Sequence, residues 1–279
     1  MKIAIFQMHV QYGKPAENLA KVERFLREAA SRTADLAVLP ELWPTGFDLP
    51  NVEGHIANPA HAAITERLRA MAKELGVDIM AGSMMCRSDK PGKVCNTAHY
   101  ISNEGDVLAT YSKMHLYPPM DEDKYLAPGS THDVFSTRFR PAAMAVCYDL
   151  RFPELFRQYA LDGAQIVLVS SAWPADHVGL LRDLARIRAL ENQYFLIVVN
   201  CSGSTGGQIF GGMSAIYDPV GRPILECGPD EQAAFADIDF AILDKARAAL
   251  PALDGYRSDI DWLRPPRSGA DKMPNAGKE

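Results

Sequence analysis

The pattern of hydrophobic and polar positions predicts short buried strands that alternate with amphipathic helices. Uninterrupted apolar runs of about four to eight residues are typical of buried strands. Such runs predict strands at residues 2–7, 35–40, 77–84, 142–147, 165–171, 194–200 and 233–240. Apolar residues at helical spacing predict helices at residues 18–31, 61–75, 176–192 and 241–250, and another that begins near Pro153.

Two further pairs of apolar segments predict β-hairpins, because each pair encloses residues that favour turns. Segments 96–101 and 107–111 enclose Asn103-Glu104-Gly105-Asp106, and segments 213–217 and 222–227 enclose Asp218-Pro219-Val220-Gly221. Strands that alternate with helices and are interrupted by hairpins predict an α/β fold with a mixed sheet or two sheets. No glycine- and serine-rich linker divides the chain, so we expect one domain and an extended arm from Pro251.

The composition excludes several classes of protein. The chain has 279 residues, of which 47% are hydrophobic and 23% charged, with a formal net charge of −6. The negative charge argues against nucleic-acid binding, and no apolar segment approaches the length of a membrane span. The five cysteines are widely spread without a Cys-x-x-Cys pair, which indicates neither a disulfide framework nor a zinc site. Without a signal-peptide pattern, we expect a cytoplasmic protein.

The candidate chemistry lies where the predicted strands end. Cys147 ends the run 142–147, and α/β sheets bind ligands beyond the carboxyl ends of their strands. Taken alone, Cys147 is more typical of a small buried residue that caps a core strand. Glu41 follows the run 35–40 and is either a partly desolvated general base or a solvated loop carboxylate.

Two further charged residues lie in the polar loop 112–129, which is a plausible wall of an active site. Lys113 comes directly after the second strand of the first predicted hairpin, and Glu122 lies in a run of charged residues. Taken singly, each is typical of a solvated surface residue. We expect His115 to form structural hydrogen bonds.

The order of these motifs resembles the nitrilase superfamily of carbon–nitrogen hydrolases. The resemblance extends over residues 2–262 and rests on an ordered set: Pro40-Glu41, Ser112-Lys113-Met114-His115, Cys147-Tyr148-Asp149-Leu150-Arg151-Phe152, Ala189-Leu190-Glu191-Asn192-Gln193 and Gly212-Met213-Ser214. Each motif is weak alone, whereas the set fills three catalytic positions on three separate strands. The resemblance implies a four-layer α-β-β-α sandwich at residues 1–262, a C-terminal tail at 263–279, and a homodimer built through helices and the C-terminal arm.

The resemblance also implies roles for four residues. Glu41, Lys113 and Cys147 match the Glu-Lys-Cys triad of the family, and Glu122 matches its second glutamate, although Asp121 and Asp123 flank it. Cys147 would attack an amide carbonyl after losing its proton to Glu41. Lys113 and the backbone N–H of Tyr148 would stabilise the oxyanion. Such a mechanism needs no metal or organic cofactor.

The residues around the motifs favour an amide substrate over a nitrile. Nitrile-cleaving members usually have Trp-Glu after the cysteine, whereas this chain has Tyr148-Asp149. Residues 40–47 and 171–174 are similar to ω-amidase-like members, which hydrolyse monoamides of short dicarboxylates. Arg151 is a candidate for binding the far carboxylate, or else a structural ion-pair partner of Asp149 or Glu154. The aromatic residues expected to wall the pocket are Trp43, Phe47, Tyr117 and Trp173.

Two alternatives remain at this point. One is a member of the same family that hydrolyses N-carbamoyl compounds or another small amide. The other is a non-catalytic interaction protein that kept the fold. An intact set of Glu41, Lys113 and Cys147 argues against the second alternative.

Overall fold

Two β-sheets form the centre of the protein in the computed structural model, which describes residues 1–88 and 92–260. The first sheet contains, in spatial order, β13 (Gln232–Asp237), β1 (Lys2–Gln7), β2 (Leu36–Val38), β3 (Asp78–Arg87), β4 (Val94–Ile101) and β5 (Val107–Ser112). The second contains β12 (Pro223–Glu226), β11 (Ala215–Tyr217), β8 (Phe195–Asn200), β7 (Ile166–Ser171) and β6 (Ala142–Val146). The predicted tail at 263–279, and with it the boundary at 262, lies outside the described residues.

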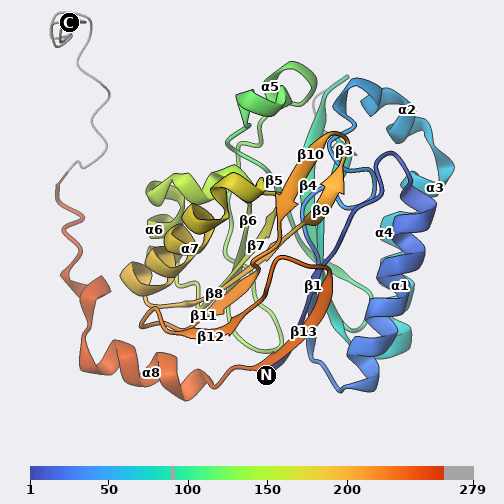
Figure 1. Cartoon of the computed structure of the whole chain (residues 1–279). Helices are drawn as coiled ribbons and strands as arrows, with labels where there is room; N and C mark the ends of the chain where they lie inside the picture. The colour runs from blue at the N-terminus through green and yellow to red at the C-terminus, as the bar shows by residue number, and fades with distance from the viewer. Residues whose placement is uncertain (89–91, 261–279) are drawn as a thin grey trace, which may run out of the picture.

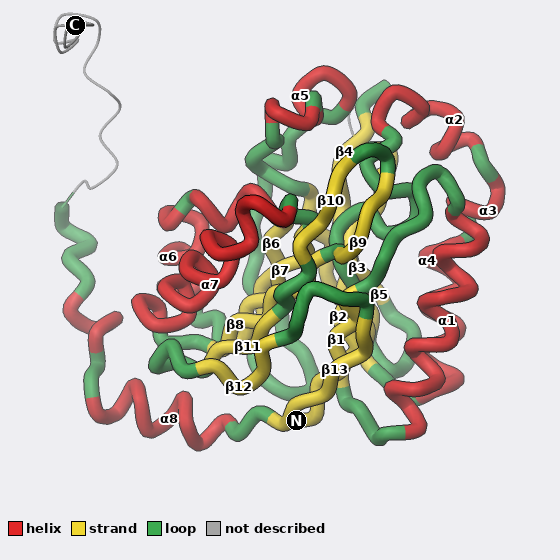
Figure 2. Tube along the Cα trace, in the orientation of Figure 1, coloured by secondary structure: helices red, strands yellow, loops and turns green. Residues whose placement is uncertain are grey.

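Helices cover the outer face of each sheet, α1 (Pro15–Ser31) and α4 (Ile64–Leu75) on one side, α6 (Pro153–Leu161) and α7 (Val178–Asn192) on the other (Figure 1). The remaining helices are α2 (Val52–Ala57), α3 (Pro59–Ala62), α5 (Glu122–Tyr125) and α8 (Phe240–Ala249). Figure 2 shows the same arrangement, with the strands between two groups of helices.

Alternation along β1 explains the layers. Ile3 and Ile5 belong to the core between the two sheets, together with Ile166 and Leu168 of β7, which share the face where Ser170 contacts Leu39 and Met80 of the first sheet. Ala4 and Phe6 point to the opposite face, where the ring of Phe6 stacks on Phe25 of α1 at 4.9 Å. Since successive side chains of a strand point to opposite faces, each sheet packs both on the other sheet and on its own helices. The predicted four-layer α-β-β-α sandwich is confirmed.

Parallel pairing brings several strand ends to one edge of the sandwich. β1, β2 and β3 run parallel to one another, as do β6, β7 and β8. The segments that follow β2, β6 and β7 therefore leave the sheets at their carboxyl ends, where α/β folds bind ligands. A backbone hydrogen bond of 3.3 Å from Glu41 to Ser171 joins the segments after β2 and β7 across the two sheets.

The predicted hairpins form as β4–β5 and β11–β12, and strand 2–7 is confirmed with both its ends. Four elements are missed: α2, α3, α5 and a hairpin of β9 (Ser202–Thr205) and β10 (Gln208–Gly211). The hairpin strands are short and partly polar, so they lack an apolar signature. Residues 251–260 contain one 3₁₀ turn (Ala252–Gly255) and are mostly exposed, as expected for an arm. Within the described chain, no helix is both long and apolar enough to cross a bilayer.

Candidate active site

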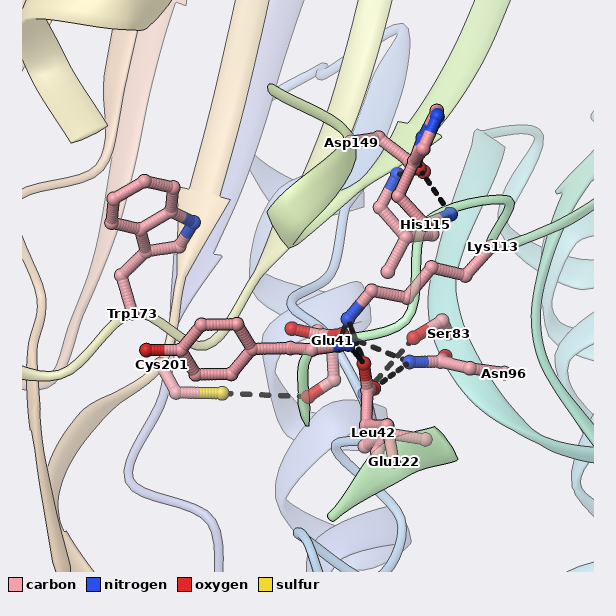
Figure 3. A network of polar contacts seen from close by, with 12 residues as sticks. Glu41, Leu42, Ser83, Asn96, Lys113, His115, Glu122, Asp149, Trp173 and Cys201 are labelled. Atoms are coloured by element: carbon pink, nitrogen blue, oxygen red, sulfur yellow. Dashed lines mark hydrogen bonds and ion pairs between the residues drawn. The ribbon is translucent and has the colours of Figure 1, made fainter. Parts of the chain in front are cut away.

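Three charged side chains meet in the interior at the edge where these strands end. Lys113 Nζ lies 2.9 Å from Glu41 Oε1 and 2.7 Å from Glu122 Oε2 (Figure 3). All three side chains have zero solvent exposure. Charges are rarely buried to this degree unless they are paired, because each loses its hydration. The three residues, which taken singly fit solvated positions, are therefore a buried cluster.

The backbone around Glu41 is held in an uncommon conformation. Leu42, the next residue, has a φ of +44°, in the left-handed region that a leucine seldom occupies. The Leu42 N–H donates to Ser83 Oγ at 3.1 Å, and the thiol of Cys201 donates to the carbonyl of Glu41 at 3.5 Å. A residue in a strained conformation persists only where its surroundings fix it. The contacts of Ser83 and Cys201 therefore hold this segment, and with it the carboxylate of Glu41, in place.

Cys147 follows β6 and begins a 3₁₀ turn (Cys147–Arg151) with a φ of +52°. Asp149 fixes this turn, because its buried carboxylate accepts the Val146 N–H at 2.9 Å and the Tyr111 hydroxyl at 2.7 Å. The other carboxylate oxygen accepts the backbone N–H of His115 at 2.9 Å and bonds to its ring Nδ1 at 2.8 Å. His115 thus has the structural role predicted for it, and Asp149 connects the cysteine turn to the loop that begins at Lys113.

Burial sets the protonation of Cys147 and its neighbours. Burial, and then the charge of Glu41, raise the pKa of Cys147 well above its usual value. Burial also raises the pKa of Glu41, although Lys113 opposes the shift. For Lys113, burial favours the neutral form, but Glu41 and Glu122 outweigh it and hold the pKa well above its usual value. The Cys147 thiol is therefore neutral and lies beside the carboxylate of Glu41. Among the described residues, no nitrogen or oxygen atom donates a hydrogen bond to Glu41 Oε2.

A pocket opens onto the thiol. It is lined by Phe47, Lys113, Tyr117, Met120, Cys147, Tyr148, Arg151, Ala172, Trp173, Pro174 and His177. All five residues predicted to contact substrate are among them: Phe47, Tyr117, Tyr148, Arg151 and Trp173. The assignment of Trp43 to the pocket wall is wrong. Its indole is fully buried in the core and donates to the carbonyl of Ala81 at 2.8 Å.

Arg151 lies at the mouth of this pocket and does not form the alternative ion pair. Its guanidinium carbon lies 5.0 Å from the ring centroid of Trp173 and 5.9 Å from that of Tyr148. Asp149 is fully buried and bonds to His115 instead. Among the described residues, no carboxylate lies within ion-pair distance of Arg151. Its charge is therefore available to a ligand.

Comparison with known proteins identifies the family. A family model described as carbon-nitrogen hydrolase matches residues 2–248. The chain belongs to the carbon-nitrogen hydrolase family.

Relatives of this carbon-nitrogen hydrolase include characterised amidases. The chain is 38% identical over 258 residues to a 2-oxoglutaramate amidase of Bacillus subtilis (strain 168), covering 92% of this chain and 98% of that protein. It is 30% identical over 275 residues to an omega-amidase of Danio rerio, covering 93% and 95%. A crystal structure of an amidase from Nesterenkonia sp. superposes with a TM-score of 0.81 at 31% identity, covering 90% of this chain and 95% of that one. Another structure of that amidase has acrylamide added at its active-site cysteine.

Sequence reasoning missed three residues of this carbon-nitrogen hydrolase's site. Asn96 of β4 donates from Nδ2 to Glu41 Oε1 at 2.9 Å and to Glu122 Oε1 at 3.3 Å, so it bridges the two carboxylates. Its signal was a polar amide inside an apolar strand, where an unpaired amide would be costly. Met120 and His177 line the pocket without a signal in the sequence. Among the described residues, no cluster of histidine, cysteine and acidic side chains is suited to a metal ion.

Proposed function

We propose that this carbon-nitrogen hydrolase is an ω-amidase-like enzyme that releases ammonia from the monoamide of a short dicarboxylic acid. One observation carries the proposal: a single pocket holds a thiol beside a buried carboxylate and ammonium, with an arginine at its mouth. The thiol, the carboxylate and the ammonium perform amide hydrolysis. The arginine recognises a substrate with a negatively charged end. The names of the relatives from Bacillus subtilis and Danio rerio support the same activity.

The first half of the reaction forms a thioester. Glu41 removes the proton of Cys147 as the sulfur attacks the amide carbon, because the buried thiol is not ionised beforehand. The negative charge that develops on the amide oxygen is stabilised by Lys113 and by the backbone N–H of Tyr148. The C–N bond then breaks, and Glu41 returns the proton to the departing ammonia.

The second half hydrolyses the thioester. A water molecule gives a proton to Glu41 and attacks the acyl carbon, and the same donors hold the oxyanion. The C–S bond breaks, the thiol regains the proton, and the acid product leaves. Glu122 keeps Lys113 in position throughout, since its carboxylate contacts Nζ and also accepts the Tyr117 N–H at 2.6 Å.

The pocket fits a small substrate with one charged end. Aromatic side chains line it, namely Phe47, Tyr117, Tyr148 and Trp173. Arg151 is placed to pair with a carboxylate, and a guanidinium can bind a carboxylate through two hydrogen bonds. A short monoamide such as 2-oxoglutaramate would present its amide to Cys147 and its carboxylate to Arg151.

A substrate panel tests the proposal. Ammonia release from 2-oxoglutaramate is compared with turnover of N-carbamoyl amino acids, with Cys147→Ala as the blank. We expect 2-oxoglutaramate to be preferred and an acyl adduct on Cys147 to be visible by mass spectrometry. A preference for N-carbamoyl compounds would establish the alternative specificity within the family. No turnover above the blank and no adduct would indicate a non-catalytic interaction protein.

We also propose that the protein is a homodimer. Helix α7 exposes apolar side chains at Leu180, Ile187 and Leu190, which are 38%, 45% and 43% exposed. A row of exposed apolar residues on one helix is typical of an interaction surface. Light scattering should show a dimer, and Ile187→Glu should shift it toward the monomer. A cytoplasmic location and a domain boundary at residue 262 stay predictions.

A further inference from the structure

The mouth of the pocket carries a second group that can meet an anion. Its lining includes Lys113, Arg151 and His177 but no aspartate or glutamate. The charge of Lys113 is engaged by Glu41 and Glu122, which leaves Arg151 and His177 for a substrate. Resting on the proposed ω-amidase function, we propose that His177 is a second residue that recognises the substrate carboxylate, and that Asp176 positions it.

The geometry defines which ring nitrogen is used. His177 Nδ1 lies 2.8 Å from Asp176 Oδ1, so the proton on Nδ1 is held by the carboxylate. A neutral ring in this tautomer has no proton on Nε2 and can only accept a hydrogen bond there. Nε2 becomes a donor when the ring is protonated. His177 therefore binds a carboxylate as the imidazolium, through a charge-assisted hydrogen bond.

The charged groups around His177 are few. The 3₁₀ turn that carries it (Ala175–His177) packs against β10, which has no titratable side chain, and against the start of α7. The first turn of α7, residues 178–181, has none either. Within the described residues, Asp176 is the charged group bonded to the ring. The titratable groups that line the same pocket are Arg151, Lys113, Cys147, Tyr117 and Tyr148.

The carboxylate end of the substrate is what Arg151 and His177 would recognise. A neutral amide of equal length offers no carboxylate to either residue, so its turnover measures the reacting group alone.

The test compares three amides with the same reacting group: neutral pentanamide, glutaramate and 2-oxoglutaramate. The measured quantity is the ratio of kcat/KM for each anionic amide to that for pentanamide, in the wild type, His177→Gln and His132→Gln. We expect His177→Gln to lower the ratio about tenfold at pH 6.5, mainly through KM, since it removes one charge-assisted contact. His132 contacts Tyr159 and does not line the pocket, so its variant should keep the ratio of the wild type.

The outcomes separate the two proposals. If the wild type prefers the anionic amides and His177→Gln keeps that preference, the role of His177 is refuted and the ω-amidase function stands. If the wild type shows no preference for the anionic amides, both proposals fail. A fold defect in His177→Gln is detected by its turnover of pentanamide. In that case, Asp176→Asn decides, because it leaves His177 in place but removes the carboxylate that holds the Nδ1 proton, and an unchanged ratio for this variant refutes the inference.

Discussion

Replacing Lys113 with methionine tests the buried cluster most directly. Methionine keeps much of the length of the side chain but removes the ammonium, so Glu41 and Glu122 would face each other without a counter-charge. In the native protein Nζ lies within 2.9 Å of both carboxylates, and none of the three side chains is exposed. The substitution therefore leaves two carboxylates both buried and unpaired.

The expected loss of stability is large. Removing one partner of a buried ion pair typically costs about 3–5 kcal/mol, because the remaining charge is left desolvated. Turnover should fall at least about a hundredfold, since one donor to the oxyanion is lost. Lys124→Met is a suitable control, because Lys124 is 65% exposed and its ion pair, among the described residues, is with the exposed Asp121. That variant should leave the stability nearly unchanged, since exposed ion pairs contribute little.

The loss of stability in Lys113→Met should depend on pH. Burial raises the folded-state pKa of Glu41 above its unfolded value, and removing Lys113 raises it further. A carboxyl with a raised folded pKa destabilises the fold above that pKa, and the penalty disappears as the pH falls and the group is protonated. The pKa of Lys113 is raised well above its usual value, so its own contribution is constant below pH 9. Urea unfolding at pH 8 and pH 5.5 measures the difference. The reasoning is refuted if Lys113→Met is as stable as the wild type at pH 8. It is also refuted if the variant loses the same free energy of unfolding at both pH values.

Three further predictions concern the same network. Asn96→Leu removes the amide that bridges Glu41 and Glu122, so we expect a loss of about 1–3 kcal/mol in urea unfolding together with a lower kcat; unchanged stability would contradict the bridging role. Asp149→Asn places an amide group among the donors that the carboxylate now accepts, and should lower the free energy of unfolding by about 3 kcal/mol or more; an undisturbed thermal midpoint would argue against it. The kcat/KM should decline as the pH falls through the raised pKa of Glu41, and Glu41→Gln should lose about a hundredfold or more of the rate; an acid limb at the value of an ordinary glutamate would show that the carboxyl is not buried in the working enzyme.

The main elements could be predicted from local sequence pattern. β1 begins and ends at the predicted residues, and strand 165–171 differs from β7 by one residue. Buried strands leave continuous apolar runs, which is a local signal. The β9–β10 hairpin was missed because its strands are short and partly polar, although Gly206 and Gly207 are typical of a two-residue hairpin turn. The periodicity did not distinguish one mixed sheet from two sheets. The four-layer arrangement was predicted from the resemblance to the family.

The sequence by itself determined which residue types follow the strands, and so where a nucleophile, an acid and a lysine lie along the chain. Their meeting was decided by the tertiary structure. Glu41 and Lys113 are 72 residues apart, and no pattern of nearby residues encodes the packing of one sheet on the other. The same reason explains why the place of His177 in the pocket and the open charge of Arg151 were visible only in the fold. Burial and pairing depend on neighbours that are distant in sequence, whereas strand and helix signals depend on near ones.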